Sequence, residues 1–593
     1  MIGTQVVKVR RVMAAVVIGA VAFCLSARAQ VLDQVPSDAV VVLKINNLQG
    51  VSQKVAKMAK DFGIDEFQPQ FKDPLGSLME EGHITKGVNK SGDAVVCGFK
   101  SGEQKGEALI LVPVDNFKDF ISNFEAAGPT DGPVVEVKDP KGGQNMFIAD
   151  RGKFAACSPD KALVQKKGTG IKLPTASAKD AQGRDAIVFI NIPGVRDDAL
   201  SELRKHRQEA IDEMSKNLEN DANAKPFAGV AKVVAGQVFD LAERFLSDCQ
   251  GVVFSVNLND QGISLGGLSE FTADSKFGKT VSQFKNTSSP LMAGLPDRKY
   301  YAFGGAAWDP KAISGIVNDC IDPINAELKK SGDTGKQIAT LLESAKTLAG
   351  SINRVAAGYP MAQGAIGNEA IIQQISVIDG DAKKIASAEH SMFLGLGQLM
   401  ALVPKEAGQM KMDVTEGAKT VDGVKLDSYS MSVTPDPNNP QAAQMQQMMA
   451  MIYGPNGMGG LMGVVDNKTF IALQGANDKL ISDAIAAAKS QKDVLGSSKG
   501  VQSVSGQLPK QRMLEEYIAL DNIVSAGVRY AQGFGLQVKM KLPQDLPPIG
   551  VAAGTEGPAI RGEVFIPSQT VQSLISAGLQ AYQQMQGGGN GGL

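Results

Sequence analysis

The stretch Asp38–Lys60, "DAVVVLKINNLQGVSQKVAKMAK", carries the pattern on which the fold prediction rests. Its apolar, valine-rich run predicts a β-strand, and the polar corner "INNLQG" then interrupts the run. Apolar residues recur after the corner at helical spacing, at Val51, Val55, Met58 and Phe62. The stretch therefore predicts a strand, a corner with a polar residue of the N-cap type, and an amphipathic helix.

The same pattern returns from Leu295, in "LPDRKYYAFGGAAWDPKAISGIVNDC". Four further pairs of segments resemble each other in the same order along the chain: those from Gly106 and Asn368, Asp150 and Asp466, Asp185 and Gly500, and Gly251 and Ile549. This order predicts a tandem duplication with halves at 31–288 and 291–593. Each half is expected to be α+β, with a mostly antiparallel sheet of short strands and helices on one face.

Three segments lie outside the repeated pattern. The region 196–247 has helical periodicity and is expected to divide into two helices around Pro226. The second half carries a Met-, Gln- and Gly-rich insertion at 434–460, which predicts an exposed loop with a short helix. The Gly-rich C-terminus predicts a flexible tail.

The N-terminus has the pattern of a secretory signal peptide at 1–29. Basic residues in "KVRR" precede the apolar run "VMAAVVIGAVAFCLSA", and "ARA" ends at Ala29, so cleavage is expected between Ala29 and Gln30. A membrane anchor is disfavoured because the apolar run is short and a cleavage pattern follows it. The pattern predicts export to the periplasm or the cell exterior, and it leaves open general secretion or twin-arginine export.

Composition narrows the class of function. The formal net charge is −2, and the first 29 residues contribute four cationic side chains and no acid, so the remainder is mildly acidic. Such a surface has no electrostatic footprint for nucleic acid or anionic lipid. No later stretch is long and apolar enough to predict a transmembrane segment.

The four cysteines left after cleavage do not form the dense pattern of a disulfide scaffold. A bridge between Cys97 and Cys157 and two free buried thiols are both compatible with export and with the apolar neighbours of these two cysteines. The four cysteines are Cys97, Cys157, Cys249 and Cys320.

No candidate catalytic or cofactor-binding motif lies in the local structure that its chemistry requires, so the chain is predicted not to be an enzyme. "GISLG" around Ser264 matches a nucleophile elbow, but its turn precedes the motif and the sequence continues as a strand. The three histidines are scattered, which disfavours a triad or a zinc site. The glycine-rich segments lack the residues that complete a nucleotide-binding loop, so no cofactor and no metal are predicted.

The methionines of the insertion admit three hypotheses. They could dock a short helix onto its own domain, form an adaptable patch for an apolar partner, or hold copper(I) through thioether sulfur. The first is the most common role of methionine. The candidate patch consists of Met445, Met448, Met449 and Met451.

The opening "LDQVPSDAVVVLKINNLQGVSQKVAK", together with "DPLGSL" at Asp73–Leu78, resembles the start of exported bacterial proteins of a domain-of-unknown-function family. The resemblance implies an exported bacterial protein and supplies no catalytic residues.

These observations predict an exported, non-enzymatic binding or envelope-associated protein of two similar halves, whose partner the sequence does not identify. A sheet with one covered face leaves another face for a ligand, and an apolar or lipid-like ligand is one alternative. An exported hydrolase with an unrecognised active site is another. The INNLQG corner itself is interpreted as a structural joint, because its counterpart "AAWDPKA" lacks the paired asparagines.

Overall fold

The structure is a computed structural model, and it forms two compact units that are described separately. It describes residues 30–100, 108–130, 132–138, 143–220, 225–362, 370–400, 409–434, 452–453, 458–533 and 542–587. The first unit contains the described residues up to Leu200, with Phe245–Gly278 and Glu556–Ser576. The second contains Ser201–Arg244, Lys279–Thr555 and the described residues from Ala577 onward.

The first unit combines one antiparallel sheet with short helices. Its strands are β1 (Val41–Ile45), β2 (Ala94–Gly98), β3 (Ala108–Pro113), β4 (Val134–Val137), β5 (Met146–Asp150), β6 (Phe154–Ser158), β7 (Ala186–Ile190), β8 (Cys249–Asn259), β9 (Gly262–Phe271) and β19 (Ala559–Pro567). Its helices are α2 (Gln30–Asp33), α3 (Leu48–Asp61), α4 (Pro74–Glu81), α5 (Phe117–Ile121), α6 (Lys161–Gln165) and α7 (Thr175–Gly183).

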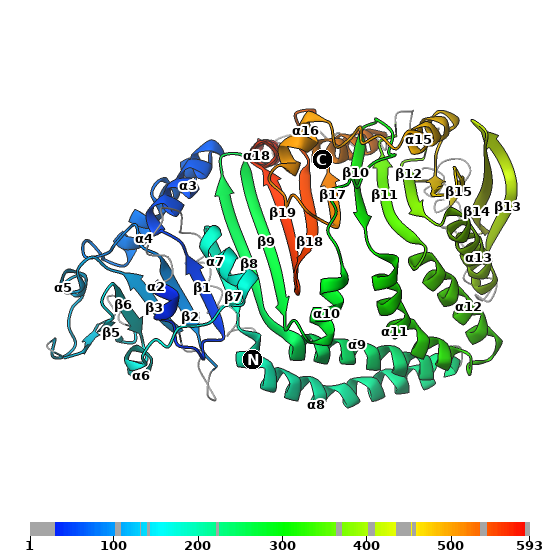
Figure 1. Ribbon diagram of the computed structural model, residues 1–593. Coiled ribbons are helices and arrows are strands. Elements are labelled where there is room, and N and C mark those ends of the chain that lie inside the picture. The colour runs from blue at the N-terminus through cyan, green and yellow to red at the C-terminus, as the bar shows by residue number, and fades with distance from the viewer. Residues whose placement is uncertain are drawn as a thin grey trace. The chain divides into compact units, whose positions relative to one another are not determined.

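The strands of this sheet pair in the order β4-β5-β6-β3-β2-β1-β7-β8-β9-β19, and every pairing is antiparallel. The last strand, β19, comes from near the C-terminus and lies beside β9 (Figure 1). The sequence predicted a hairpin at each of these places but not that β19 would extend the first sheet.

One face of the first sheet is closed by a hydrophobic core. Alternate strand residues such as Val42, Phe189, Val253 and Leu268 point into it and are almost fully buried. Helix α7 contributes Ala176 and Ala181 to the same core. Because side chains alternate between faces along a strand, the intervening residues point to the opposite face.

The second unit also combines an antiparallel sheet with helices. Its strands are β10 (Tyr300–Ala307), β11 (Ile352–Pro360), β12 (Gln374–Gly380), β13 (Gln409–Val421), β14 (Val424–Thr434), β15 (Met458–Val464), β16 (Thr469–Gln474), β17 (Leu514–Ile518) and β18 (Ile549–Glu556). Its helices are α11 (Pro310–Leu328), α12 (Gly332–Ala349), α13 (Ala382–Met400), α15 (Asp478–Ser490), α16 (Lys499–Ser505) and α17 (Leu520–Gly533).

The strands of the second sheet pair in the order β13-β14-β15-β16-β12-β11-β10-β17-β18, again all antiparallel. β10 has the same pairing pattern as β1 in the first sheet. Each of them pairs with the next strand along the chain and with a strand much later in the sequence, which is β7 for β1 and β17 for β10. The α+β class is therefore confirmed.

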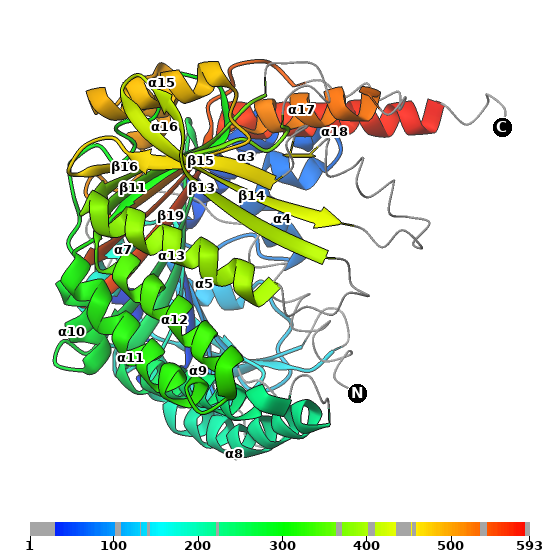
Figure 2. The same ribbon diagram turned by 90° about the vertical axis from the view of Figure 1, so that its right-hand side faces the viewer.

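The expectation of helices on one face does not describe the second unit, which has helices on both. Helices α11, α12 and α13 lie side by side (Figure 2), and Ile385 of α13 packs in a cluster with Phe470 and Ile378 of the sheet. On the opposite face, the backbone of α15 at Ala488 lies near Val377 and Gly294. Because helices cover both faces of the sheet here, strand β16 buries both its odd-numbered and its even-numbered residues.

Four helices contain residues of both units: α8 (Ile192–Glu219), α9 (Ala228–Asp248), α10 (Lys276–Gln283) and α18 (Ser568–Gly587). The predicted break near Pro226 is confirmed, since a short 3₁₀ turn at Lys225–Phe227 separates α8 from α9. Among the described residues, no helix is both long and apolar enough to cross a membrane.

One predicted correspondence between segments is out of register. The segment from Gly500 begins in helix α16, and the strand that was expected at its start, β17, begins only at Leu514. A residue-by-residue alignment of two strand patterns fails here because the connections before them differ in length.

Candidate functional site

The residues predicted from sequence as a partner patch cannot be placed. Met445, Met448, Met449 and Met451 lie outside the described residues, as does Ala29, whereas Gln30 begins helix α2. Both ends of the predicted insertion belong to strands, because β14 ends at Thr434 and β15 begins at Met458.

The INNLQG corner joins β1 to α3, as its interpretation as a joint predicted. Asn47 occupies the N-cap position with φ of 46°, and its side chain makes no capping hydrogen bond. Its backbone N–H donates to Asp93 Oδ1 at 2.8 Å, while the Asn46 side chain donates to the carbonyl of Ala181 at 3.0 Å. At the corner predicted as its counterpart, Asp309 does cap its helix by accepting from the backbone N–H of Lys311.

The described cysteines are all free thiols, so no disulfide forms among them in this structure. Three are buried and Cys320 is exposed. Burial raises the pKa of Cys97 and of Cys157 to about 12, and that of Cys249 to about 11. The buried thiols are therefore poor nucleophiles at neutral pH.

The first unit presents an open apolar surface on the face of its sheet opposite the core. Phe254 is 54% exposed, Leu265 42% and Ile560 36%, although each lies within a paired strand. We call this surface the apolar face. It consists of Val188, Ile190, Val252, Phe254, Val256, Ile263, Leu265, Gly267, Ser269, Ile560, Gly562, Val564 and Ile566.

Two glycines are direct cross-strand partners within the apolar face. Gly267 pairs with Gly562 on one side and with Phe254 on the other. A Cβ at either glycine would meet no atom within 4 Å, so the backbone of this glycine pair is open on that face. The neighbouring row of cross-strand partners includes Leu265 and Val564.

The apolar face offers almost nothing for polar recognition. Ser269 is the one side chain in it that can form a conventional hydrogen bond. β8 and β9 have partners along both edges, so their backbone N–H and C=O groups are occupied by the ladders. The surface suits a ligand that is itself apolar.

The charged residues of the same strands point the other way, into the closed face. Arg184 holds Glu563 of β19 through two hydrogen bonds of 2.8 Å, and Arg561 contacts both carboxylate oxygens of Asp180 at 2.8 Å. The Glu270 carboxylate accepts from the N-terminus of α7. Glu270 and Glu563 are only 6% and 5% exposed. The open face is thus apolar and the covered face contains the charges, which reverses the usual arrangement of a half-exposed sheet.

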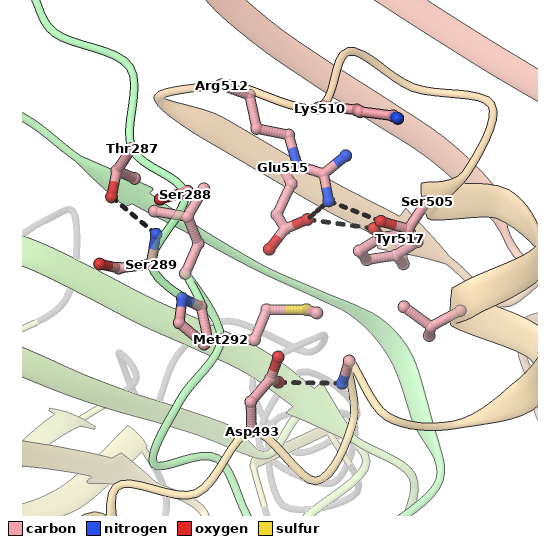
Figure 3. A pocket seen from close by; sticks show the side chains of 14 residues that line it. Thr287, Ser288, Ser289, Met292, Asp493, Ser505, Lys510, Arg512, Glu515 and Tyr517 are labelled. Atoms are coloured by element: carbon pink, nitrogen blue, oxygen red, sulfur yellow. Dashed lines mark hydrogen bonds and ion pairs between the residues drawn. The ribbon is translucent and has the colours of Figure 1, made fainter.

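The second unit contains a small polar cavity of about 170 Å³. Figure 3 shows Glu515 and Tyr517 of β17 beside Arg512, with Asp493 opposite them. Arg512 contacts Glu515 at 2.6 Å, and the Tyr517 hydroxyl donates to the same carboxylate at 3.1 Å. Burial raises the pKa of Glu515 above its ordinary value, although Arg512 opposes that effect.

The residues that line this cavity include no histidine, and the hydroxyl of Ser505 accepts a hydrogen bond from Arg512 at 2.6 Å.

Ser264, the residue of the rejected elbow motif, is 3% exposed and lies within strand β9, so the predicted strand is confirmed there.

The sequence analysis identified neither the apolar face nor the cavity. The alternation "ISLGGLSEF" of β9 and "AIRGEVFI" of β19 is visible in the sequence, and it separates apolar from polar residues. It does not indicate which of the two sets is covered, since that depends on where α7 packs.

Comparisons with known proteins leave the family open. No family model and no curated protein matches the chain. Crystal forms IV and III of TP0453 match 49% of this chain and 97% and 98% of their own, at 10% and 9% identity and a TM-score of 0.19. Similarity at that level establishes neither a shared fold nor a shared function.

Proposed function

We propose that the protein is an exported, non-enzymatic binding protein, built by internal duplication, whose ligand is apolar and lipid-like. The observation that carries the proposal is the apolar face, on which exposed aliphatic and aromatic side chains surround an open pair of glycines while the charges of the same strands are buried behind it. Contiguous apolar surface of this kind marks an interaction site in a soluble domain.

The open glycine pair Gly267–Gly562 favours an alkyl chain over a folded partner. Leu265 and Ser269 lie four residues apart on one strand, or about 13 Å, so the glycine row between them leaves room for a chain of methylene groups. Each methylene removed from water contributes about 0.8 kcal/mol. A short acyl segment therefore gains useful affinity with no polar contact.

Internal duplication is supported by the strand order. In the first sheet the central strand β1 pairs with the next strand along the chain and with β7, which comes much later in the sequence, and β7 in turn pairs with β8. In the second sheet β10 likewise pairs with the next strand and with the much later β17, and β17 in turn pairs with β18. Export remains supported by the signal-peptide pattern alone. Isolation of the protein from its host should give a chain that begins at Gln30, and a chain still beginning at Met1 would contradict export.

Ligand binding is tested with a fluorescent fatty acid whose emission rises in an apolar environment. Phe254→Ser should weaken binding about tenfold, which corresponds to about 1.4 kcal/mol of lost contact. The matched control is Phe67→Ser, because Phe67 is 61% exposed but lies outside the sheet. Equal affinities of the two variants, or no binding by the wild-type protein, would refute the proposal.

A further inference from the structure

The polar cavity of the second unit has walls that are fixed by specific contacts. Its lining segment at Thr287–Met292 is tied to the loop before β17, because the Thr287 backbone N–H donates to the Arg512 carbonyl at 3.0 Å. The buried guanidinium of Arg354 holds the same segment through the carbonyl of Leu291 at 2.9 Å. The cavity is therefore a built feature of the unit.

The residues that line the cavity include two carboxylates, Asp493 and Glu515, and two cations, Lys510 and Arg512. Arg512 compensates Glu515, to which it is bound at 2.6 Å. Within the described chain Asp493 has no ion pair, and its Oδ1 accepts only the backbone N–H of Gly496 at 2.9 Å. Lys510 is exposed to solvent and lies on the side of the cavity opposite Asp493 (Figure 3). The partly exposed carboxylate of Asp493 therefore lacks an ion-pair partner among the described residues.

We propose that this cavity binds the primary ammonium group of a small molecule. An ammonium group carries N–H donors, and the two carboxylates that line the cavity, Asp493 and Glu515, can accept hydrogen bonds from it. Met292 and Val501 line the same space and accommodate a short carbon chain. This site is separate from the apolar face and does not depend on the function proposed for it.

A metal ion fits the cavity less well than an ammonium group. Calcium takes six to eight oxygen ligands, and carboxylates normally supply several of them. The described residues contain no group of three or more histidine, cysteine, aspartate or glutamate side chains placed to hold a metal. The volume of about 170 Å³ also limits the ligand to a few heavy atoms beyond the ammonium group.

Calorimetric titration of the full chain with propylammonium tests the proposal, with 1-propanol and tetramethylammonium as matched probes. The first lacks the charge and the second lacks N–H donors, so only propylammonium is expected to bind. Asp493→Asn should weaken this binding at least tenfold. Glu516→Gln is the control, because Glu516 neighbours Glu515 on β17 but is exposed and does not line this cavity.

Each outcome decides for or against the site. Absence of propylammonium binding, equal binding of 1-propanol, or equal affinities of the Asp493 and Glu516 variants would overturn it. The ammonium group could belong to a free amine or to an aminolipid headgroup. Flotation with phosphatidylethanolamine vesicles but not with phosphatidylcholine vesicles, lost in Asp493→Asn, would assign the lipid source, and binding of the soluble amine alone would assign the free one.

Discussion

Replacing Arg184 with methionine should destabilise the first unit while leaving the second unchanged. The guanidinium of Arg184 holds both oxygens of Glu563 at 2.8 Å, and its side chain is 17% exposed against 5% for its partner. Arg184→Met leaves the Glu563 carboxylate buried without its cation. Removal of one partner from a buried pair costs about 3–5 kcal/mol.

The single tryptophan makes it possible to observe the two units separately. Trp308 belongs to the second unit, so its fluorescence reports that unit, whereas far-ultraviolet circular dichroism reports both. With a urea m-value of about 2–3 kcal/mol/M for a unit of this size, the circular dichroism transition of the first unit should fall by about 1–2 M urea. The fluorescence midpoint should stay where it is.

Lys57→Met is the matched control in the first unit, because Lys57 pairs with Asp260 at 2.9 Å but is 54% exposed. An exposed pair of this kind contributes little to stability, because solvent screens both charges. Equal shifts for the two variants would show that burial does not strengthen the Arg184–Glu563 pair. A fluorescence midpoint that moves together with the circular dichroism would show that the units unfold as one.

Three other predictions can be checked on the same protein. Alkylation of the native chain should modify Cys320 first, because burial raises the pKa of Cys97 and Cys157 to about 12, and mass spectrometry showing equal rates would contradict this. Glu270→Gln should cost about 1–3 kcal/mol in the circular dichroism transition, since its carboxylate holds the N-terminus of α7, and an unchanged midpoint would refute that role. Because burial raises the pKa of Glu515, the folded unit binds a proton more readily than the unfolded chain, so the contribution of this group to stability should grow as the pH falls through the raised pKa. Glu515→Gln should flatten that part of the pH dependence of the tryptophan transition, and an identical dependence would exclude the effect.

Much of the local structure could be predicted from the sequence. The strand, corner and helix at Asp38–Lys60 form as β1 and α3, and the helical region breaks near Pro226, because both signals depend on residues close together in the chain. The register error at Gly500 arose because hydrophobic alternation defines a strand but not the length of the connection before it.

The candidate sites could not be predicted from local patterns. The apolar face depends on the pairing of Gly267 with Gly562, which are nearly three hundred positions apart in the sequence. The polar cavity depends on Thr287 and Arg512 meeting through one backbone hydrogen bond. Neither contact can be predicted from a single sequence, because nothing in the local sequence around each residue indicates its distant partner.

The position of β19 also governs the order in which the chain can fold during synthesis. β9 ends at Phe271 and its partner β19 begins at Ala559, so 288 residues must be added before the two can pair. At the usual rate of about 5–20 residues per second, the edge of β9 waits unpaired for about 15–60 s. During that interval it exposes both free backbone groups and apolar side chains, which is a template for aggregation.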